Sequence, residues 1–194
     1  MKIGCALLAA GAGKRFGEGK LLYEVGGDPM IARALRLYAS IPFTARICVT
    51  RAEAGEIRRL AYDHAFPVAI NPDPERGVGT SVAIATEAIL AKEPLLNGIL
   101  YAVADQPYLT QKSISRLIDT FQEHPKNIVS LSFGKRRGNP VIFPADLYTE
   151  LCALKEDIGG SAVIKRYPER LMLVQAGDER ELFDIDTREL NSSC

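Results

Sequence analysis

The sequence predicts a single α/β domain, a three-layer α/β/α arrangement with helices on both faces of a mostly parallel, Rossmann-like sheet. Short apolar runs rich in β-branched residues alternate with segments whose apolar residues recur at helical spacing. The 194 residues suffice for one substantial core, with 47% hydrophobic and 25% charged residues. No internal repeat, low-complexity tract or linker divides the chain, so residues 1–194 are expected to form one domain.

Six apolar runs are the expected strands of this sheet. They are residues 2–10, 45–50, 67–70, 98–103, 127–132 and 171–175. A glycine-rich loop follows the first run, and Asp105 follows the fourth, where Pro107 keeps the strand from continuing. Ligands of such sheets bind beyond the carboxyl ends of the strands, so the loop and Asp105 are expected at one crevice.

Between these runs, apolar residues repeat every three or four positions and predict helices that pack on the sheet. The stripes are Ile31/Leu35/Tyr38/Ile41, Ile57/Leu60/Ala61, Val82/Ala85/Ile89, Ile114/Leu117/Ile118/Phe121 and Leu147/Leu151/Leu154. Helices are expected over 79–92 and 111–121. The Gly and Pro content of residues 71–81 and 134–140 marks these two segments as loops.

Charge and cysteine usage exclude several classes of partner. Lys plus Arg and Asp plus Glu are equal at 24, so no overall basic field favours nucleic acid. No run approaches the length of a membrane span, and the first residues lack a secretory cleavage site. Cys5, Cys48, Cys152 and Cys194 show no metal-binding spacing, and the first three are expected to be reduced core residues. We therefore expect a cytoplasmic protein.

The most informative segment is residues 7–20, LLAAGAGKRFGEGK, whose loop holds four glycines and three cations. Backbone N–H groups beside Lys and Arg form a site for several negative charges, most plausibly a triphosphate. The first three glycines give G-x-G-x-x-x-G, one residue too long for the dinucleotide fingerprint. Gly13 and Gly19 enclose five residues where Walker A needs four, and Leu21 follows Lys20 where Walker A needs Ser or Thr.

This segment resembles the signature L-A-A-G-x-G-x-R-F/M-G-x-x-K of the MobA-like nucleotidyltransferases, and most closely that of molybdenum cofactor cytidylyltransferases. Further similar segments follow in the family's order between Leu7 and Leu190. The resemblance implies a fold of the nucleotide-diphospho-sugar transferase type and Mg²⁺-dependent transfer of CMP from CTP to a phosphate acceptor. The implied acceptor is a molybdopterin-like cofactor, and the implied client is a molybdenum hydroxylase. The alternative is a glycine-rich surface turn beside solvated basic residues.

The resemblance also implies which residues bind the nucleotide. They are Leu8, Ala9, Ala10, Gly11, Gly13, Lys14, Arg15, Lys20, Gly79 and Ser81. Arg15 and the loop amides would hold the β- and γ-phosphates, and Lys20 would reach the α-phosphate. In the family, L-A-A-G accompanies pyrimidine nucleotides and L-A-G-G accompanies guanine, because the methyl group of Ala10 would crowd a purine. Alternatively, Ala10 only packs beneath the loop.

Gly79 and Ser81 belong to a segment that resembles the family's G-x-x-x-S-L motif, which helps to hold the base and ribose. Val82 stands where the family has Leu. The alternative is that Thr80 or Ser81 merely caps the helix that begins here.

Asp105 is the first candidate for a Mg²⁺ ligand. Nucleotidyl transfer needs a cation that bridges phosphate oxygens, and Mg²⁺ commonly takes only one or two protein carboxylates. The family's D-x-P motif supplies such an aspartate, and the resemblance assigns that role to Asp105. Alternatively, Asp105 only orders the turn before helix 111–121.

Asp186 is the second candidate. Alternation would place Asp184 and Asp186 on one side of a short strand, with Phe183 and Ile185 opposite. The segment is similar to the family's D-I-D-T-P-E-D-L ending, with Arg188 in place of Pro, and Asp186 is preferred over Asp184. Alternatively, Asp186 or Thr187 only caps a last helix.

Residues 134–140 resemble the family's G-R-x-G-H-P segment close to the acceptor, which implies acceptor contacts from Arg137, Asn139 and Pro140. Asn139 stands where His is common, and a carboxamide cannot act as a general base near neutral pH. Adjacent cations suit an anionic acceptor, although a solvated basic turn would have the same composition. Ser161 stands where the family's D-x-G-A-R segment has Arg.

Other functions stay open at this point. They are guanylyl transfer to molybdopterin, cytidylyl transfer to an isoprenoid or sugar phosphate, and a non-catalytic protein that binds the cofactor and delivers it to a hydroxylase. A pure carrier needs no metal-binding carboxylate, so Lys20 and Asp105 favour an enzyme. A dinucleotide oxidoreductase is disfavoured because the glycine spacing does not fit.

Overall fold

The computed structural model describes residues 1–11, 13, 16–17 and 19–185. Within that part, the main sheet has the strand order β5-β4-β1-β6-β8-β7-β9. The strands are β1 (Ile3–Leu8), β4 (Ala45–Arg51), β5 (Val68–Asn71), β6 (Gly98–Val103), β7 (Ile128–Phe133), β8 (Arg136–Pro144) and β9 (Leu171–Gln175). Only β8 runs antiparallel to its neighbours among these described strands. The predicted α/β class with a mostly parallel sheet is confirmed.

The strand β8 corrects one sequence expectation, because the loop predicted over residues 134–140 lies mostly within it. The first half of β8 is polar and contains Gly138 and Pro140, so it lacks the apolar run that marks the other strands. The second half, from Val141 to Pro144, is buried and pairs with β6, and β7 pairs on the other side. Neighbouring strands therefore impose the extended conformation on a segment of low intrinsic strand preference.

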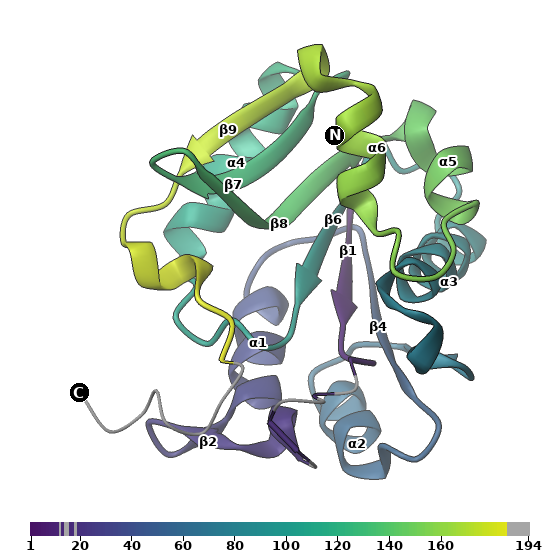
Figure 1. Cartoon of the computed structure of the whole chain (residues 1–194), viewed down its shortest axis with the longest axis vertical. Coiled ribbons are helices and arrows are strands. Elements are labelled where there is room, and N and C mark those ends of the chain that lie inside the picture. The colour runs from purple at the N-terminus through teal and green to yellow at the C-terminus, as the bar shows by residue number, and fades with distance from the viewer. Residues whose placement is uncertain (12, 14–15, 18, 186–194) are drawn as a thin grey trace.

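Helices cover both faces of the sheet, as Figure 1 illustrates. One face carries α1 (Met30–Ala39), α2 (Gly55–Asp63) and α4 (Gln111–Glu123), and the other carries α3 (Val78–Lys92), α5 (Tyr148–Cys152) and α6 (Gly160–Arg166). The remaining elements are short: the hairpin β2 (Glu24–Val25) and β3 (Asp28–Pro29), and 3₁₀ helices at Lys20–Leu22, Pro74–Arg76, Ala145–Leu147, Pro168–Arg170 and Glu179–Leu182. The three-layer prediction is thus confirmed.

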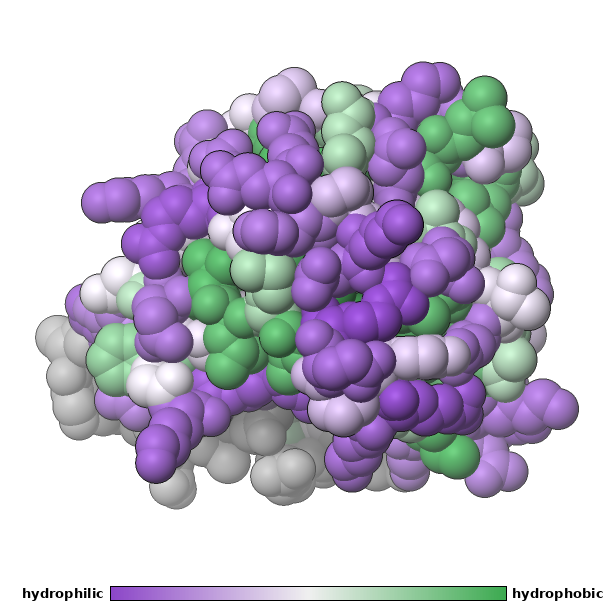
Figure 2. All heavy atoms as spheres, turned by 90° about the horizontal axis from the view of Figure 1, so that it is seen from above, coloured by the Kyte–Doolittle hydropathy of each residue, from purple (hydrophilic) through white to green (hydrophobic). Residues whose placement is uncertain are grey.

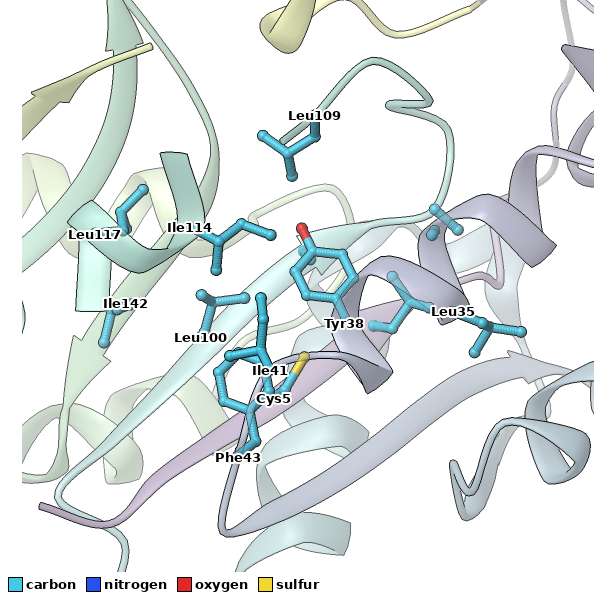
Figure 3. Close-up of a cluster of buried hydrophobic side chains, with 14 of the residues drawn as sticks. Cys5, Leu35, Tyr38, Ile41, Phe43, Leu100, Leu109, Ile114, Leu117 and Ile142 are labelled. Atoms are coloured by element: carbon cyan, nitrogen blue, oxygen red, sulfur yellow. The ribbon is translucent and has the colours of Figure 1, made fainter. Parts of the chain in front are cut away.

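Apolar side chains fill both spaces between sheet and helices. Figure 3 shows part of the first cluster, in which Cys5 of β1 and Leu100 of β6 meet Tyr38 of α1 and Ile114 of α4. Cys5 and Cys48 are buried and free, and burial raises the pKa of the Cys48 thiol to about 12. Their role is therefore packing, as predicted.

Cys152 is also free, as predicted, but it is only partly buried. Cys194 lies outside the described residues.

Hydrophilic side chains cover most of the face in Figure 2, and hydrophobic side chains gather in separate spots between them. In the described part of the chain, no helix combines the length and apolar character needed to cross a membrane.

The register of β1 and β6 positions the segments of functional interest. The two strands pair in parallel with Leu8 opposite Val103, so both end at the same level of the sheet. The glycine-rich loop continues from β1, and Asp105 follows two residues after β6. The expected crevice at the carboxyl ends of the strands therefore has both of its predicted walls.

Candidate functional site

A cleft of about 450 Å³ opens where β1 and β6 end. The glycine-rich loop forms one wall, and the start of α3 with the loop before it forms another. The predicted nucleotide-binding residues that line this cleft are Leu8, Ala9, Ala10, Gly11, Gly13, Lys20 and Ser81. Gly79 does not line it. Lys14 and Arg15 lie outside the described residues.

Hydrogen bonds from the neighbouring strand β4 hold the start of the glycine-rich loop. The Ala9 N–H donates to the Val49 carbonyl at 2.7 Å. The Arg51 guanidinium donates through Nη2 to the Ala10 carbonyl at 3.1 Å. Ala10 lines the cleft, is only 1% exposed and packs in the cluster on the α3 side, so it is held in place by the core.

Gly13 turns the loop back toward the sheet. Its φ of +57° lies in the left-handed region, which glycine adopts without strain. The N–H groups of Phe16 and Gly17 both donate to the Gly13 carbonyl at 2.9 Å. This turn precedes Lys20, the first residue of a 3₁₀ helix.

Lys20 and Asp105 meet across the cleft, although 85 positions separate them in the chain. Lys20 Nζ lies 2.6 Å from Asp105 Oδ2 in a charge-assisted hydrogen bond. Their side chains are 12% and 23% exposed, so the pair is partly shielded from water. The two residues that sequence analysis assigned to phosphate and to metal therefore lie in one place.

The start of α3 is packed against the loop over residues 155–159. The Gly79 N–H donates to the Glu156 carbonyl at 2.8 Å. A Cβ atom on Gly77 would lie 2.2 Å from Asp157 Oδ1, and one on Gly79 would lie 2.6 Å from the Ile158 carbonyl oxygen. Such distances leave no room for a side chain, so both glycines serve close packing.

The hydroxyl groups of this segment do not cap α3, which has no side-chain cap. Asn71 Nδ2 instead donates to Thr80 Oγ1 and to Ser81 Oγ, each at 2.9 Å. The alternative of a plain helix cap is therefore wrong. Ser81 faces the cleft with its hydroxyl already held by Asn71.

The C-terminal segment reaches the same region but does not form the predicted strand. The chain forms a 3₁₀ helix at Glu179–Leu182, and residues 183–185 belong to no strand. The Ile185 N–H donates to the Asp105 carbonyl at 3.2 Å. Gln106 Nε2 donates to Asp184 Oδ1 at 2.9 Å. Asp186, the preferred second metal ligand, lies outside the described residues.

A buried carboxylate holds the turn that precedes residues 183–185. Glu181 is 2% exposed and accepts hydrogen bonds from the backbone and side chain of Thr110 and from the Gly177 N–H. Burial alone raises the pKa of Glu181, but hydrogen bonds from Ser113, Thr110 and Gly177 outweigh it and lower the pKa below its usual value. These bonds fix the turn of the 3₁₀ helix ahead of residues 183–185.

The described residues suit a metal ion that takes most of its ligands from substrate phosphates and water. Within that part of the chain, no group of three His, Cys, Asp or Glu side chains is placed to hold a metal. Asp105 supplies a carboxylate in the cleft, and Mg²⁺ characteristically combines one or two carboxylates with substrate phosphates and water. The donor chemistry therefore fits Mg²⁺ bound together with a polyphosphate.

A second cavity of about 270 Å³ adjoins the cleft. The two share Leu8, Val78 and Val103. Arg137 and Asn139 line the second cavity, as does Ser161, whereas the predicted Pro140 does not. Arg137 is partly buried, and the loss of hydration lowers the pKa of its guanidinium.

Apolar and aromatic side chains form the rest of this cavity. The rings of Tyr101 and Phe143 meet edge to face, with centroids 5.8 Å apart. The predicted acceptor residues Arg137 and Asn139 thus line a cavity together with the buried side chains of Tyr101 and Phe143, rather than lying in an open loop.

Sequence analysis missed Glu75 and Asp157, which both line the cleft. Glu75 lies in the Pro-rich segment that was interpreted only as a loop, and Asp157 lies in the segment similar to D-x-G-A-R. Their types and flanking motifs were visible, but only packing of distant segments brings them to the cleft.

Comparison with known proteins gives a family profile and relatives of matching length. The profile described as "MobA-like NTP transferase domain" matches residues 5–171. The chain is 29% identical over 192 residues to nicotine blue oxidoreductase of Paenarthrobacter nicotinovorans, covering 94% of this chain and 91% of the relative. It is 27% identical over 190 residues to purine catabolism protein PucB of Bacillus subtilis, covering 94% and 90%.

Solved structures share the fold. A nucleotidyl transferase from Methanothermobacter thermautotroptrophicus superposes with a TM-score of 0.81 at 22% identity, covering 96% of this chain and 92% of that one. Rv0371C of Mycobacterium tuberculosis in complex with manganese gives 0.71 at 21%, covering 91% and 90%. The 4-diphosphocytidyl-2C-methyl-D-erythritol synthase of Anaerococcus prevotii gives 0.73 at 16%, covering 97% and 92%. These matches confirm the predicted fold type.

Proposed function

The chain belongs to the MobA-like NTP transferase family, and we propose that it transfers CMP from CTP to a phosphorylated acceptor and releases pyrophosphate. The observation that carries this proposal is the meeting of Lys20 and Asp105 at 2.6 Å in the cleft beneath the glycine-rich loop. A metal-bound triphosphate requires a cationic side chain for its phosphates and a carboxylate for its metal ion, close together.

The reaction we propose is an in-line attack of the acceptor phosphate on the α-phosphorus of CTP. A phosphate monoester is largely ionised near neutral pH, so the attack needs no activating base. Lys20 would hold the α-phosphate, and the loop amides would hold the β- and γ-phosphates, with Arg15 as a further predicted contact. Asp105 would hold Mg²⁺, which would neutralise charge on the phosphate oxygens when bound.

The proposed preference for CTP rests on Ala10. Ala10 lines the cleft and is packed against the α3 side of the core, so it cannot withdraw from a bound base. A purine is larger than a pyrimidine and would meet this fixed wall. The synthase of Anaerococcus prevotii, named for a diphosphocytidyl product, is consistent with a cytidine nucleotide in this fold.

The second cavity is the proposed acceptor site. Arg137 would bind the acceptor phosphate, and the apolar lining of the cavity, which includes the buried Tyr101 and Phe143, would contact a planar ring system. A molybdopterin-like cofactor combines both features. Delivery of the product to a molybdenum hydroxylase is part of the same proposal.

The proposal is tested by pyrophosphate release from CTP, GTP, UTP and ATP in the presence of Mg²⁺, with and without molybdopterin. We expect release from CTP that requires the acceptor. Guanylyl transfer would appear as a preference for GTP, and a different cytidylyltransferase would use CTP only with an isoprenoid or sugar phosphate. Absence of release from every nucleotide with any of these acceptors would contradict nucleotidyl transfer.

One relative is named an oxidoreductase, so the same preparation should be tested for oxidation of NADH and NADPH with a quinonoid dye. The glycine spacing of the loop disfavours dinucleotide binding, and we expect no oxidation. A pure cofactor carrier would bind molybdopterin without pyrophosphate release, and Asp105→Ala would leave its binding unchanged.

A further inference from the structure

The ion pair between Lys20 and Asp105 creates a conflict for the proposed function. Lys20 Nζ donates to Asp105 Oδ2 at 2.6 Å, in a short charge-assisted hydrogen bond. The proposed reaction needs the ammonium on a phosphate and the carboxylate on a divalent cation. Both groups must therefore exchange partners when substrates bind.

Coulomb repulsion makes this exchange cooperative. A divalent cation that approaches Asp105 meets the ammonium of Lys20, and like charges a few ångströms apart in a partly shielded site repel strongly. With 12% and 23% of the two side chains exposed, solvent screens the pair less than it screens a surface pair.

Glu75 and Asp157 also line the cleft, but the described residues do not group them with Asp105 into a metal site. No group of three potential ligands among His, Cys, Asp and Glu is found in the described residues. A cation without nucleotide would therefore have to displace Lys20 from Asp105 with few other protein ligands. A triphosphate would supply oxygen ligands to the cation. It would also offer Lys20 an anionic partner, which makes the displacement of Lys20 from Asp105 less costly.

We infer that Lys20 competes with the metal for Asp105 in the nucleotide-free protein, so that metal and nucleotide bind cooperatively. This inference rests on the proposed function. Lys20 then has two successive partners: it holds Asp105 in place before substrates bind, and it moves to the nucleotide when the cation takes the carboxylate. The protein would bind Mg²⁺ weakly alone and strongly with CTP.

Titration of the nucleotide-free protein with Mn²⁺, followed by the EPR signal of the free ion, tests this inference directly. We expect Lys20→Met to bind Mn²⁺ about tenfold more tightly than the wild type, within the usual range of coupling between sites. Lys20→Gln should behave alike, and circular dichroism shows whether each variant is folded. Asp105→Asn added to Lys20→Met should remove the gain.

The control for lost charge is Lys92→Met. Lys92 is exposed and ends α3, whose other end lines the cleft. Equal Mn²⁺ affinity of the wild type and both Lys20 variants would overturn the inference, as would an equal gain in Lys92→Met.

Addition of CTP separates this inference from the proposed function. CTP should raise Mn²⁺ affinity much more in the wild type than in Lys20→Met. Mn²⁺ binding with CTP that does not depend on Asp105 would count against the proposed metal site itself. Asp105-dependent binding with no effect of Lys20 would overturn only the competition.

Discussion

Substitution of Gly77 by alanine should destabilise the protein far more than the added methyl group suggests. Gly77 has φ +107° and ψ 175°, a region that essentially only glycine occupies. The new Cβ atom would also lie 2.2 Å from Asp157 Oδ1 and 2.5 Å from both the Asp157 nitrogen and the Glu156 carbonyl carbon. Two of these three atoms belong to the backbone, so rotation of one side chain cannot relieve the overlap.

Two energetic costs determine how much stability Gly77→Ala should lose. Backbone strain in this region costs about 1–3 kcal/mol, and overpacking against a well-packed neighbour costs about 1–3 kcal/mol. Gly77→Ala should therefore lower the free energy of unfolding by about 2–6 kcal/mol. Gly134 is a matched control, because it has φ +57° and no neighbouring atom lies within 4 Å of the position that a Cβ would take there. Gly134→Ala should cost only about 1–2 kcal/mol, the strain of the left-handed region alone.

Urea unfolding of the two variants and the wild type at one temperature measures both losses. The difference between the variants combines the contact of α3 with the loop over residues 155–159 and the smaller difference in backbone strain between the two positions. If Gly77→Ala loses no more than Gly134→Ala, the close approach of that loop to the start of α3 is refuted.

Three further predictions concern the site and its supports. Lys20→Ala should lower the rate of pyrophosphate release by about 10²–10³-fold; near-normal transfer by the folded variant would remove Lys20 from the chemistry. Ala10→Gly should raise kcat/KM for GTP relative to CTP by about tenfold, since one methyl group in a pocket is worth that much discrimination; an unchanged ratio would show that Ala10 does not select the base. The lowered pKa of Glu181 means that its stabilising contribution is present above its unfolded pKa and lost as pH falls through the lower folded value. Urea unfolding between pH 6 and 3 should therefore show a shallower acid loss for Glu181→Gln than for the wild type, and equal slopes would contradict this.

The sequence was sufficient to predict the parallel core of the fold and the central pair of the site. Buried parallel strands are continuous apolar runs, and Lys20 and Asp105 follow two such runs, so topology alone brings them to one edge. The strand β8 was missed because its first half is polar. The helix α6 was missed because seven residues are too few to show a helical period.

The remaining errors share a physical cause, namely contacts between distant segments. The short strand expected to hold Asp184 and Asp186 does not appear in the described residues 183–185, which follow a turn held by the buried Glu181. The partners of Glu181, Thr110 and Ser113, lie about 70 positions earlier in the chain. Asp157 reaches the cleft only because its loop packs on glycines near the start of α3. Alternation along a single segment contains no information about either contact.

Leu8, Val78 and Val103 line both the cleft and the second cavity, so a substitution at any of them changes the shape of both spaces. Smaller side chains at these positions would enlarge the cavity for one substrate and at the same time remove contacts with the other. Relatives that accept a bulkier second substrate should therefore carry altered affinity for the first, even where every phosphate contact is retained. We therefore expect the affinities for the two substrates to change together when any of these three shared residues is replaced.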